Sequence, residues 1–598
     1  MAAGCASEGV ESIESTEDDL TSLTARSRAL VFDAYVYVRV GASNSEIEAA
    51  IKRQNQSAFG ATRTADIGVN RRELKITLAE LDPKYFSKTE VNVVDAKNPN
   101  APATKMLKVQ YRYTDTAVVP VPMANKSSAS LAVLAGNYQL QAKRILAECT
   151  PNAKHDIDFE DSIWYVFDPS LSKCKAAMSK EQSAIEADRA LVGPGNTPSS
   201  EINRLYVPIT VSLGRDSTND KISYPEYDQL YRGGVKKGRL VIGMVNGIMA
   251  DWAAGEKHEL YEDYGYPMWF EGLEEIFKSR PEFKFARIDG NADLKNFVIA
   301  GKTGTSQTVV FKNGFADIMA MEVSGKRPEG VTYDNLGAVR KVVAERLARK
   351  WLSFEAPVRV KIGNEAEREV VIELNTYFGA ETDAAPYKRA VKGSDIFVYN
   401  GHSYIGYGPL DPKNFRASDF PSTYQMMFVN GCVSYNYYHQ DYFPLKGGTK
   451  RLDLVTNGLE SWVAGSGGAM GRFIGAIVNG RQSSYKEILK ASQFLPNELG
   501  YSWGRDALRL VDGELDNTYS PATSPIKVRS STGSTEVDAG TDGGAVEPNA
   551  CAKSQVKGCP SGAPQYRWDC FNGCEAQCYY GTLYTSGRNF SSSGSCAQ

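Results

Sequence analysis

Two residues of this sequence have side chains that together can break a peptide bond, Cys432 and His402. A thiolate is a strong nucleophile, and a nearby imidazole keeps the thiol ionised and then protonates the leaving amine. Each residue follows a glycine at the end of an apolar run, in DIFVYNGHSY and in YQMMFVNGCVSY. If the two runs are adjacent parallel strands, both side chains emerge at one edge of the sheet. The pattern therefore predicts a Cys–His dyad at that edge.

The turns around the dyad offer backbone donors for a negatively charged oxygen. The N–H of Cys432 and those of the turn formed by Gly401, His402 and Ser403 are expected to point to the place where an oxyanion forms. Gly431 permits the sharp turn before Cys432, as Gly401 does before His402. Two alternatives stay open: His439 as the partner of Cys432, and a purely packing role for His402.

The elements that must position the dyad are apolar strands separated by helices, from about Leu205 onward. This texture predicts an α/β fold with a mainly parallel sheet covered by helices on both faces. Reactive groups in such folds lie in the loops that leave the carboxyl ends of the strands. Strands are expected at 238–245, 283–288, 369–374, 395–399, 424–429 and 451–456, and helices at 268–279, 336–351, 387–391 and 471–478.

These motifs resemble those of the caspase-like cysteine peptidases, the group that includes caspases, gingipains, clostripain and legumain. In that group one strand ends in a His motif and another in the nucleophilic Cys, as in NGH at 400–402 and NGC at 430–432. The short His-to-Cys interval is most similar to that of the gingipain branch. The resemblance covers about 210–515 and implies a caspase-like three-layer sandwich with cysteine endopeptidase activity.

The resemblance extends past the dyad. VTNG at 455–458, followed by Ser461 and Trp462, resembles the strand that pairs with the substrate backbone, and 471–478 resembles the helix after it. The implied partner is a protein or peptide substrate. No metal or other cofactor is expected, although structural calcium often supports exported relatives.

Three positions depart from the family. Ser403 stands where the family usually has Gly. Val463 follows Ser-Trp where caspases have the Arg that reads an acidic P1 residue, so specificity for Asp is not expected. Asn430 stands where clostripain-like enzymes place an acid. No residue therefore predicts the substrate preference.

The ten cysteines indicate an oxidising compartment. Cys149 and Cys174 flank one segment and are expected to close it as a disulfide. Six more crowd the C-terminal tail at spacings that suit disulfides better than zinc. These six are Cys551, Cys559, Cys570, Cys574, Cys578 and Cys596. Cys432 is left over, and an unpaired thiol in an exported protein is a liability unless it has a role.

The N-terminal residues predict the location. MAAGC at 1–5 resembles the end of a bacterial lipoprotein signal, where small residues precede the cysteine that is lipidated, although the charged and apolar parts of such a signal are missing. We therefore expect a lipid on Cys5 that anchors the protein to a membrane, with a start that is truncated or misplaced. The expected location is the bacterial cell envelope, as an outer-membrane lipoprotein, or the medium. A chance cysteine in a frayed tail is the alternative.

Length and composition predict several domains. A chain of 598 residues is too long for one hydrophobic core, and 42% hydrophobic with 23% charged residues is ordinary for a globular protein. The net charge of −3, without a long basic run, argues against nucleic acid as a partner. The expected parts are a tether at 1–24, an α+β accessory domain at 25–200, the peptidase domain at 205–517, a disordered linker at 518–549 and a disulfide-rich module at 550–598.

Two other functions compete with the peptidase. GKTGT at 301–305, with SxxK at 170–173 and SxN at 217–219, resembles the motifs of penicillin-binding proteins, which are acyl-serine enzymes. Such short motifs are common by chance, and this reading leaves Cys432 and His402 unexplained. The other alternative is a non-catalytic surface adhesin or binding lipoprotein, whose accessory domain and Cys-rich tail bind a target.

Overall fold

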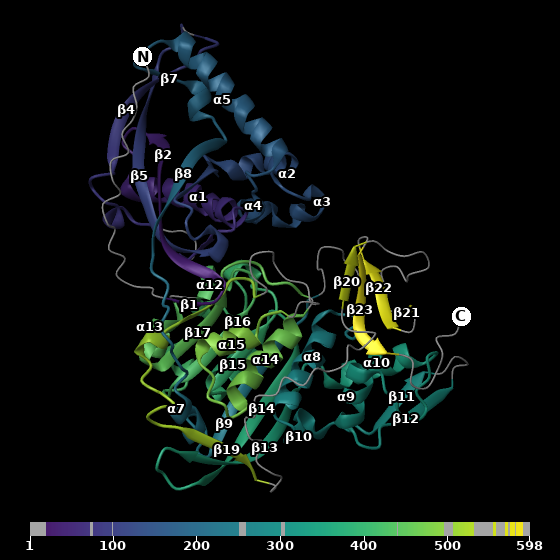
Figure 1. The fold of residues 1–598 in the computed structure, drawn as a ribbon. Coiled ribbons are helices and arrows are strands. Elements are labelled where there is room, and N and C mark those ends of the chain that lie inside the picture. The colour runs from purple at the N-terminus through teal and green to yellow at the C-terminus, as the bar shows by residue number, and fades with distance from the viewer. Residues whose placement is uncertain are drawn as a thin grey trace. The chain divides into compact units, whose positions relative to one another are not determined.

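The computed structural model shows a mixed α/β protein with two compact units (Figure 1). The first unit consists of Met1–Asp220 together with Val433–Gln440, and the second of Lys221–Cys432 together with Asp441–Gln598. The residues described are 20–71, 76–98, 100–249, 259–300, 305–438, 441–463, 465–494 and 506–531, with the backbone of four strands between 554 and 589.

The first unit is built on a largely antiparallel sheet. Its strands run in the order β6-β8-β2-β5-β4-β7, with β3 beside β5. The strands are β2 (Ala25–Arg39), β3 (Gly68–Val69), β4 (Ser87–Val94), β5 (Thr104–Pro120), β6 (Ser128–Leu134), β7 (Asn196–Pro198) and β8 (Tyr206–Asp216). The main helices are α1 (Asn44–Arg63), α2 (Ala142–Cys149), α4 (Ile163–Val166), α5 (Ser172–Val192) and α12 (Ser434–Tyr438). Helix α1 begins at a capping box of Ser43 and Glu46 and packs on the sheet.

A disulfide and a distant helix complete the first unit. Cys149 and Cys174 are bonded, with a sulfur–sulfur distance of 2.02 Å, and so join the end of α2 to α5. Helix α12 is held against β3, because Asn436 Nδ2 donates to the carbonyls of Val69 (3.2 Å) and Arg71 (2.9 Å). The eight residues after Cys432 therefore belong to the fold of the first unit.

The second unit contains a sheet with a parallel centre. The order is β18-β17-β16-β15-β9-β14-β13-β10, with β19 beside β13. Strands β14, β9, β15, β16 and β17 are mutually parallel, and the outer pairs are antiparallel. The bounds are β9 (Arg239–Gly247), β10 (Lys284–Ile288), β13 (Trp351–Ile362), β14 (Arg368–Ala380), β15 (Ile396–Asn400), β16 (Gln425–Asn430), β17 (Leu452–Asn457), β18 (Arg509–Asp512) and β19 (Ile526–Ser530).

Helices lie on both faces of this sheet. Helices α8 and α14 pack against each other on one face, where a Cβ on Gly467 would meet Met268 O at 2.1 Å. Helix α11 covers the other face, where a Cβ on Gly243 would lie 3.2 Å from Ala390 Cβ. The helices are α7 (Tyr227–Arg232), α8 (Gly265–Ser279), α9 (Phe315–Ser324), α10 (Leu336–Leu347), α11 (Ala385–Gly393), α13 (Tyr442–Lys446), α14 (Ser466–Val478) and α15 (Tyr485–Ala491).

Three segments differ from the sequence expectation. Strand β8 belongs to the first sheet, so the second unit begins at Lys221 and not at 205. The helix expected at 336–351 ends at Leu347, because Trp351 begins the long strand β13. The stretch 518–549, expected to be a disordered linker, contains β19, whose Ile526 is buried where the strand pairs with β13.

The C-terminal tail contains four strands in the order β20-β23-β22-β21. They are β20 (Ser554–Lys557), β21 (Asp569–Phe571), β22 (Cys574–Tyr579) and β23 (Thr582–Asn589). The side chains of the six tail cysteines lie outside the described residues, as does Cys5, so their predicted disulfides and lipid stay predictions.

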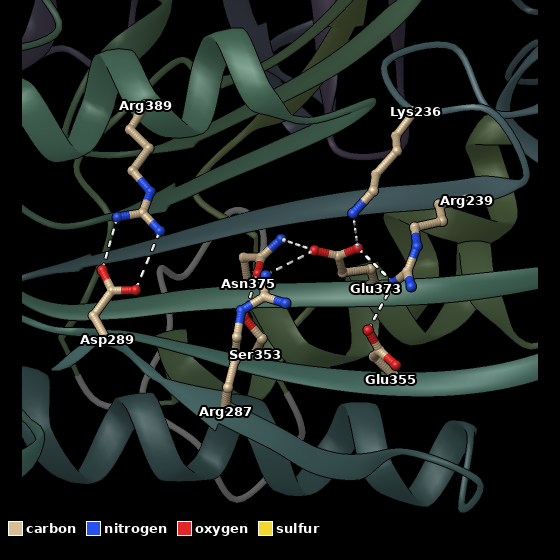
Figure 2. A network of polar contacts seen from close by, with 9 residues as sticks. All are labelled: Lys236, Arg239, Arg287, Asp289, Ser353, Glu355, Glu373, Asn375 and Arg389. Carbon is tan, nitrogen blue, oxygen red and sulfur yellow. Dashed lines mark hydrogen bonds and ion pairs between the residues drawn. The ribbon is translucent and has the colours of Figure 1, made fainter. Parts of the chain in front are cut away.

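An ion-pair cluster lies on the α11 face, around Glu373 in the middle of β14 (Figure 2). Glu373 contacts Lys236 (3.2 Å), Arg239 (2.7 Å) and Arg287 (3.4 Å), and it accepts a hydrogen bond from Asn375 (3.2 Å). Burial alone would raise the pKa of Glu373, but the bond from Asn375 and the nearby cations hold it below its usual value. These contacts stabilise a carboxylate whose side chain is only 4% exposed.

Candidate active site

The strands that precede His402 and Cys432 are neighbours in register. β15 and β16 are parallel, and Asn400 at the end of one is paired with Asn430 at the end of the other. The N–H of Gly401 donates to Asn430 O at 3.4 Å, and this bond links the two segments where they leave the sheet. His402 and Cys432 each lie two residues beyond the paired asparagines, so the topology brings both turns to one edge.

The two turns approach each other closely because both contain glycine. A Cβ built on Gly431 would lie 3.2 Å from Gly401 O and 3.4 Å from Ser403 Cβ. A Cβ on Gly401 would lie 2.3 Å from the hydroxyl of Tyr399, closer than any side chain could sit. The predicted turn residues Gly401, Ser403 and Gly431 are thus brought together, and a side chain at position 401 would have to displace the ring of Tyr399.

Cys432 is the one free cysteine among the described side chains and is half-buried. Its thiol donates to the carbonyl of Ser461 at 3.7 Å. Ser461 and Trp462 follow β17, and Trp462 is 45% exposed, with Val463 beside it 37% exposed. The segment expected to pair with a substrate backbone therefore runs past the thiol and presents apolar surface to solvent.

Both turns contain strained backbone. Ile405 (φ 51°) and Val433 (φ 51°) are the two β-branched residues with positive φ in the described part of the chain. Ile405 lies three residues after His402, and Val433 directly follows Cys432. Positive φ is unfavourable for β-branched residues and persists where the surrounding structure imposes it, commonly at functional sites. The backbone strain is thus concentrated in the turns next to His402 and Cys432.

His402 is half-buried in a tyrosine-rich turn. Its ring lies 6.0 Å from that of Tyr404 in an edge-on arrangement, and its carbonyl accepts a hydrogen bond from the Tyr399 hydroxyl at 2.9 Å. Burial raises the pKa of Tyr404 to about 12, with a smaller contribution from Glu381, so this hydroxyl is neutral at physiological pH. The hydrogen bond to the carbonyl of His402 fixes the main chain of this turn.

A row of four asparagines underlies this edge, and sequence reasoning missed it as a set. Asn246, Asn400 and Asn430 are paired across β9, β15 and β16, and Asn457 ends β17 at the same level. All four are buried on the α8 and α14 face, and each is followed by glycine. The Asn-Gly dipeptide that recurs after four apolar runs was the signal in the sequence.

Hydrogen bonds join three amides of this row, whereas neither amide atom of Asn246 has a hydrogen-bond partner among the described residues. Asn457 Nδ2 donates to Asn430 Oδ1 (3.0 Å), and Asn430 Nδ2 donates to Asn400 Oδ1 (2.9 Å). The Ser466 hydroxyl at the start of α14 also donates to Asn400 Oδ1 (3.1 Å). Arg509, fully buried, donates to both Asn457 Oδ1 and Asn430 Oδ1 at 3.3 Å. The amides connect one cation to the ends of three strands.

His439 and 301–304, on which the rival readings depend, lie outside the described residues, so those readings stay predictions. Ser170 belongs to the first unit, where its hydroxyl donates to Asp168 at 2.5 Å. Among the described residues there is no cluster of three or more His, Cys, Asp or Glu that could hold a metal ion. Nor does any helix within the described ranges have the length and apolar character to cross a membrane.

Comparisons of the chain with protein-family models, with curated proteins and with solved structures gave no match. The site must therefore be interpreted from its own geometry.

Proposed function

We propose that this protein is a cysteine endopeptidase of the caspase-like type, with Cys432 as nucleophile and His402 as its acid–base partner. The observation that carries the proposal is the register of β15 and β16, which brings a thiol outside the described disulfide and an imidazole to two adjacent, strained turns. The order of the motifs, a His turn and then a Cys turn on the adjacent strand, is the one in the family that the sequence resembles.

The arrangement supports acyl transfer in two steps. The Cys432 thiolate attacks the scissile carbonyl carbon, a C–S bond forms, and the carbonyl π electrons move to the oxygen. The oxyanion then collapses and the C–N bond breaks, while the imidazolium of His402 gives its proton to the departing amine. Water, deprotonated by His402, attacks the thioester, and release of the acid regenerates the thiol. The N–H of Cys432 is the donor best placed for the oxyanion.

The disulfide supports a location outside the cytoplasm. A buried bond between Cys149 and Cys174 is typical of proteins that fold in an oxidising compartment. A lipid on Cys5 and a place in the bacterial envelope are part of this proposal.

The direct test is cleavage of a peptide library by the full chain, together with alkylation of Cys432 by iodoacetamide. Cys432→Ala should abolish cleavage, and His402→Ala should lower kcat by about 10³-fold and slow alkylation at neutral pH. His439→Ala is the matched control, because it removes the rival imidazole, and it should retain kcat within about twofold.

Three outcomes would contradict the proposal. Cleavage that persists in Cys432→Ala would place the nucleophile elsewhere. Equal alkylation rates with and without His402 would show that the imidazole does not activate the thiol. A larger loss in His439→Ala than in His402→Ala would assign the dyad to the other histidine.

A further inference from the structure

Asn457 bonds the peptide that immediately precedes the thiol. Besides its bond to Asn430, its Nδ2 donates to the carbonyl of Gly431 at 3.2 Å. That carbonyl and the N–H of Cys432 belong to one planar trans peptide and point in opposite directions. A bond that fixes the Gly431 oxygen therefore also fixes the direction of the Cys432 N–H.

Arg509 supports Asn457 from the other side. Its Nε donates to Asn457 Oδ1 at 3.3 Å, and its guanidinium lies 4.7 Å from the ring centre of Phe428. Burial lowers the pKa of Arg509 to about 10, opposed by the charge of Asp506, so the side chain stays cationic at neutral pH. A hydrogen bond from a cation to Oδ1 polarises the amide and makes Nδ2 a better donor.

We propose that Asn457, polarised by Arg509, is a positioning residue that aims and strengthens the Cys432 N–H as the oxyanion donor. This inference rests on the proposed peptidase function. The bonds run from the guanidinium to the amide of Asn457, to the Gly431 carbonyl, and through that peptide to the N–H of Cys432. Asn457 acts through this peptide and is fully buried, away from solvent.

A purely structural role for Asn457 predicts different kinetics. Attack of Cys432 on a peptide generates an oxyanion, whereas alkylation by iodoacetamide displaces iodide and generates none. If Asn457 only holds the turn together, its loss impairs both reactions. If it positions the oxyanion donor, its loss impairs peptide cleavage alone.

The experiment compares Asn457→Ala and Asn457→Asp with the wild-type full chain, on the library peptide that wild type cleaves fastest. The Asp variant is close in size to Asn but cannot donate to Gly431 O. Both variants should lower kcat by about 10²-fold. In Asn457→Ala, which adds no charge, the rate and pH profile of Cys432 alkylation should stay within about threefold of wild type. Inhibition by a peptide aldehyde, whose adduct with the thiol carries the same oxygen, should weaken in step with kcat.

Tyr231→Phe is the matched control. Tyr231 lies on α7, is fully buried, and makes no hydrogen bond through its hydroxyl among the described residues. The variant removes a buried polar group from the same unit without touching Gly431 or the strand that carries Asn457, so kcat should be retained.

The inference is overturned if Asn457→Ala keeps its kcat, or if cleavage and alkylation fall together. A wild-type chain that cleaves no peptide, and whose Cys432 alkylation ignores His402, would instead overturn the proposed function and this inference with it. Active wild type with an unimpaired Asn457→Ala removes the inference alone.

Discussion

Four of the five parallel strands of the second unit carry a buried asparagine at the carboxyl end, whereas a buried aspartate lies at the amino end of two of them. Asp395 directly precedes β15 and accepts from the N–H groups of Val235 and Val241, both at 2.8 Å. Asp453, the second residue of β17, accepts from Asn517 Nδ2 at 2.6 Å and from two tyrosine hydroxyls. Asn457 at the other end of β17 donates to a carbonyl.

The difference follows from which backbone groups each strand end exposes. Strands that stop together leave N–H groups at the amino edge and C=O groups at the carboxyl edge, and buried groups of either kind need partners. Carboxylates only accept, whereas amides also donate. A neutral amide at the carboxyl edge satisfies carbonyls without adding a charge. The carboxyl edge is thus lined mainly by neutral amides, with Arg509 and the nearby Asp506 as buried charged groups.

The largest effect is expected where the carboxyl edge depends on its one buried cation. Arg509→Met leaves the oxygens of Asn430 and Asn457 without their cationic donor and Asp506 without its compensating charge. The free energy of unfolding should fall by about 4 kcal/mol, measured by chemical denaturation. Arg472→Met is the control: this half-buried cation donates to the carbonyls of Ala491 (3.1 Å) and Gln493 (3.0 Å), and its loss should cost about 1 kcal/mol. Equal losses would show that the asparagine row does not need its cation.

The buried aspartates at the amino edge should make the free energy of unfolding depend on pH. Burial raises the pKa of Asp453 to about 7, against 3.8 for an ordinary aspartate. Between these values the folded chain holds a proton that the unfolded chain releases, so the free energy of unfolding should decrease as pH rises from about 4 to about 7. Asp453→Asn cannot titrate and should therefore be more stable than wild type at pH 8, by about 3 kcal/mol, with little difference near pH 4.

Asp395 provides the check on that assignment. Burial raises its pKa to about 6, so it contributes to the pH dependence of wild type in the same direction and is unchanged in Asp453→Asn. Subtracting the two stability profiles therefore isolates Asp453. A difference that does not vary with pH would contradict the raised pKa.

The smallest loss of unfolding free energy is expected in the middle of the sheet, where Glu373 forms ion pairs with nearby cations. Glu373→Gln leaves Lys236, Arg239 and Arg287 to repel one another and should cost about 2 kcal/mol, less at high salt. Asp289→Asn breaks the pair with Arg389 in the same view (2.7 Å), whose partners are 43% and 57% exposed, and should cost less than about 1 kcal/mol (Figure 2). If chemical denaturation gave the same loss of unfolding free energy for Glu373→Gln and Asp289→Asn, burial would not strengthen the ion pairs of Glu373.

The elements that sequence reasoning found are those with a local signal. The apolar runs before His402 and Cys432 predicted β15 and β16, and their bounds agree within a residue. Strand β13 was missed entirely, because the helical pattern before it runs on to Trp351 without a cap and no strand was predicted between there and 369. β8 was assigned to the wrong side of a boundary because its alternation is equally compatible with either sheet.

The site was predicted only as far as its turns. His402, Cys432 and Ser461 were named from motifs, and the structure places their turns at one edge of the sheet or its adjoining loop. Arg509 and Asn246 were missed, because a buried arginine partner and a fourth strand end become visible only when strands distant in sequence are aligned. The four Asn-Gly dipeptides can be read in the sequence, but only the register of the strands shows that the asparagines lie side by side.

The assignment of Val433–Gln440 to the first unit has a practical consequence. The chain leaves the second unit directly after the thiol and returns eight residues later, so no single cut separates the two. A fragment that starts at Lys221 would carry this segment without the strand that receives it, and the buried rings of Tyr435 and Tyr437 would face water. Excising the first 220 residues would therefore disturb the segment that directly follows Cys432.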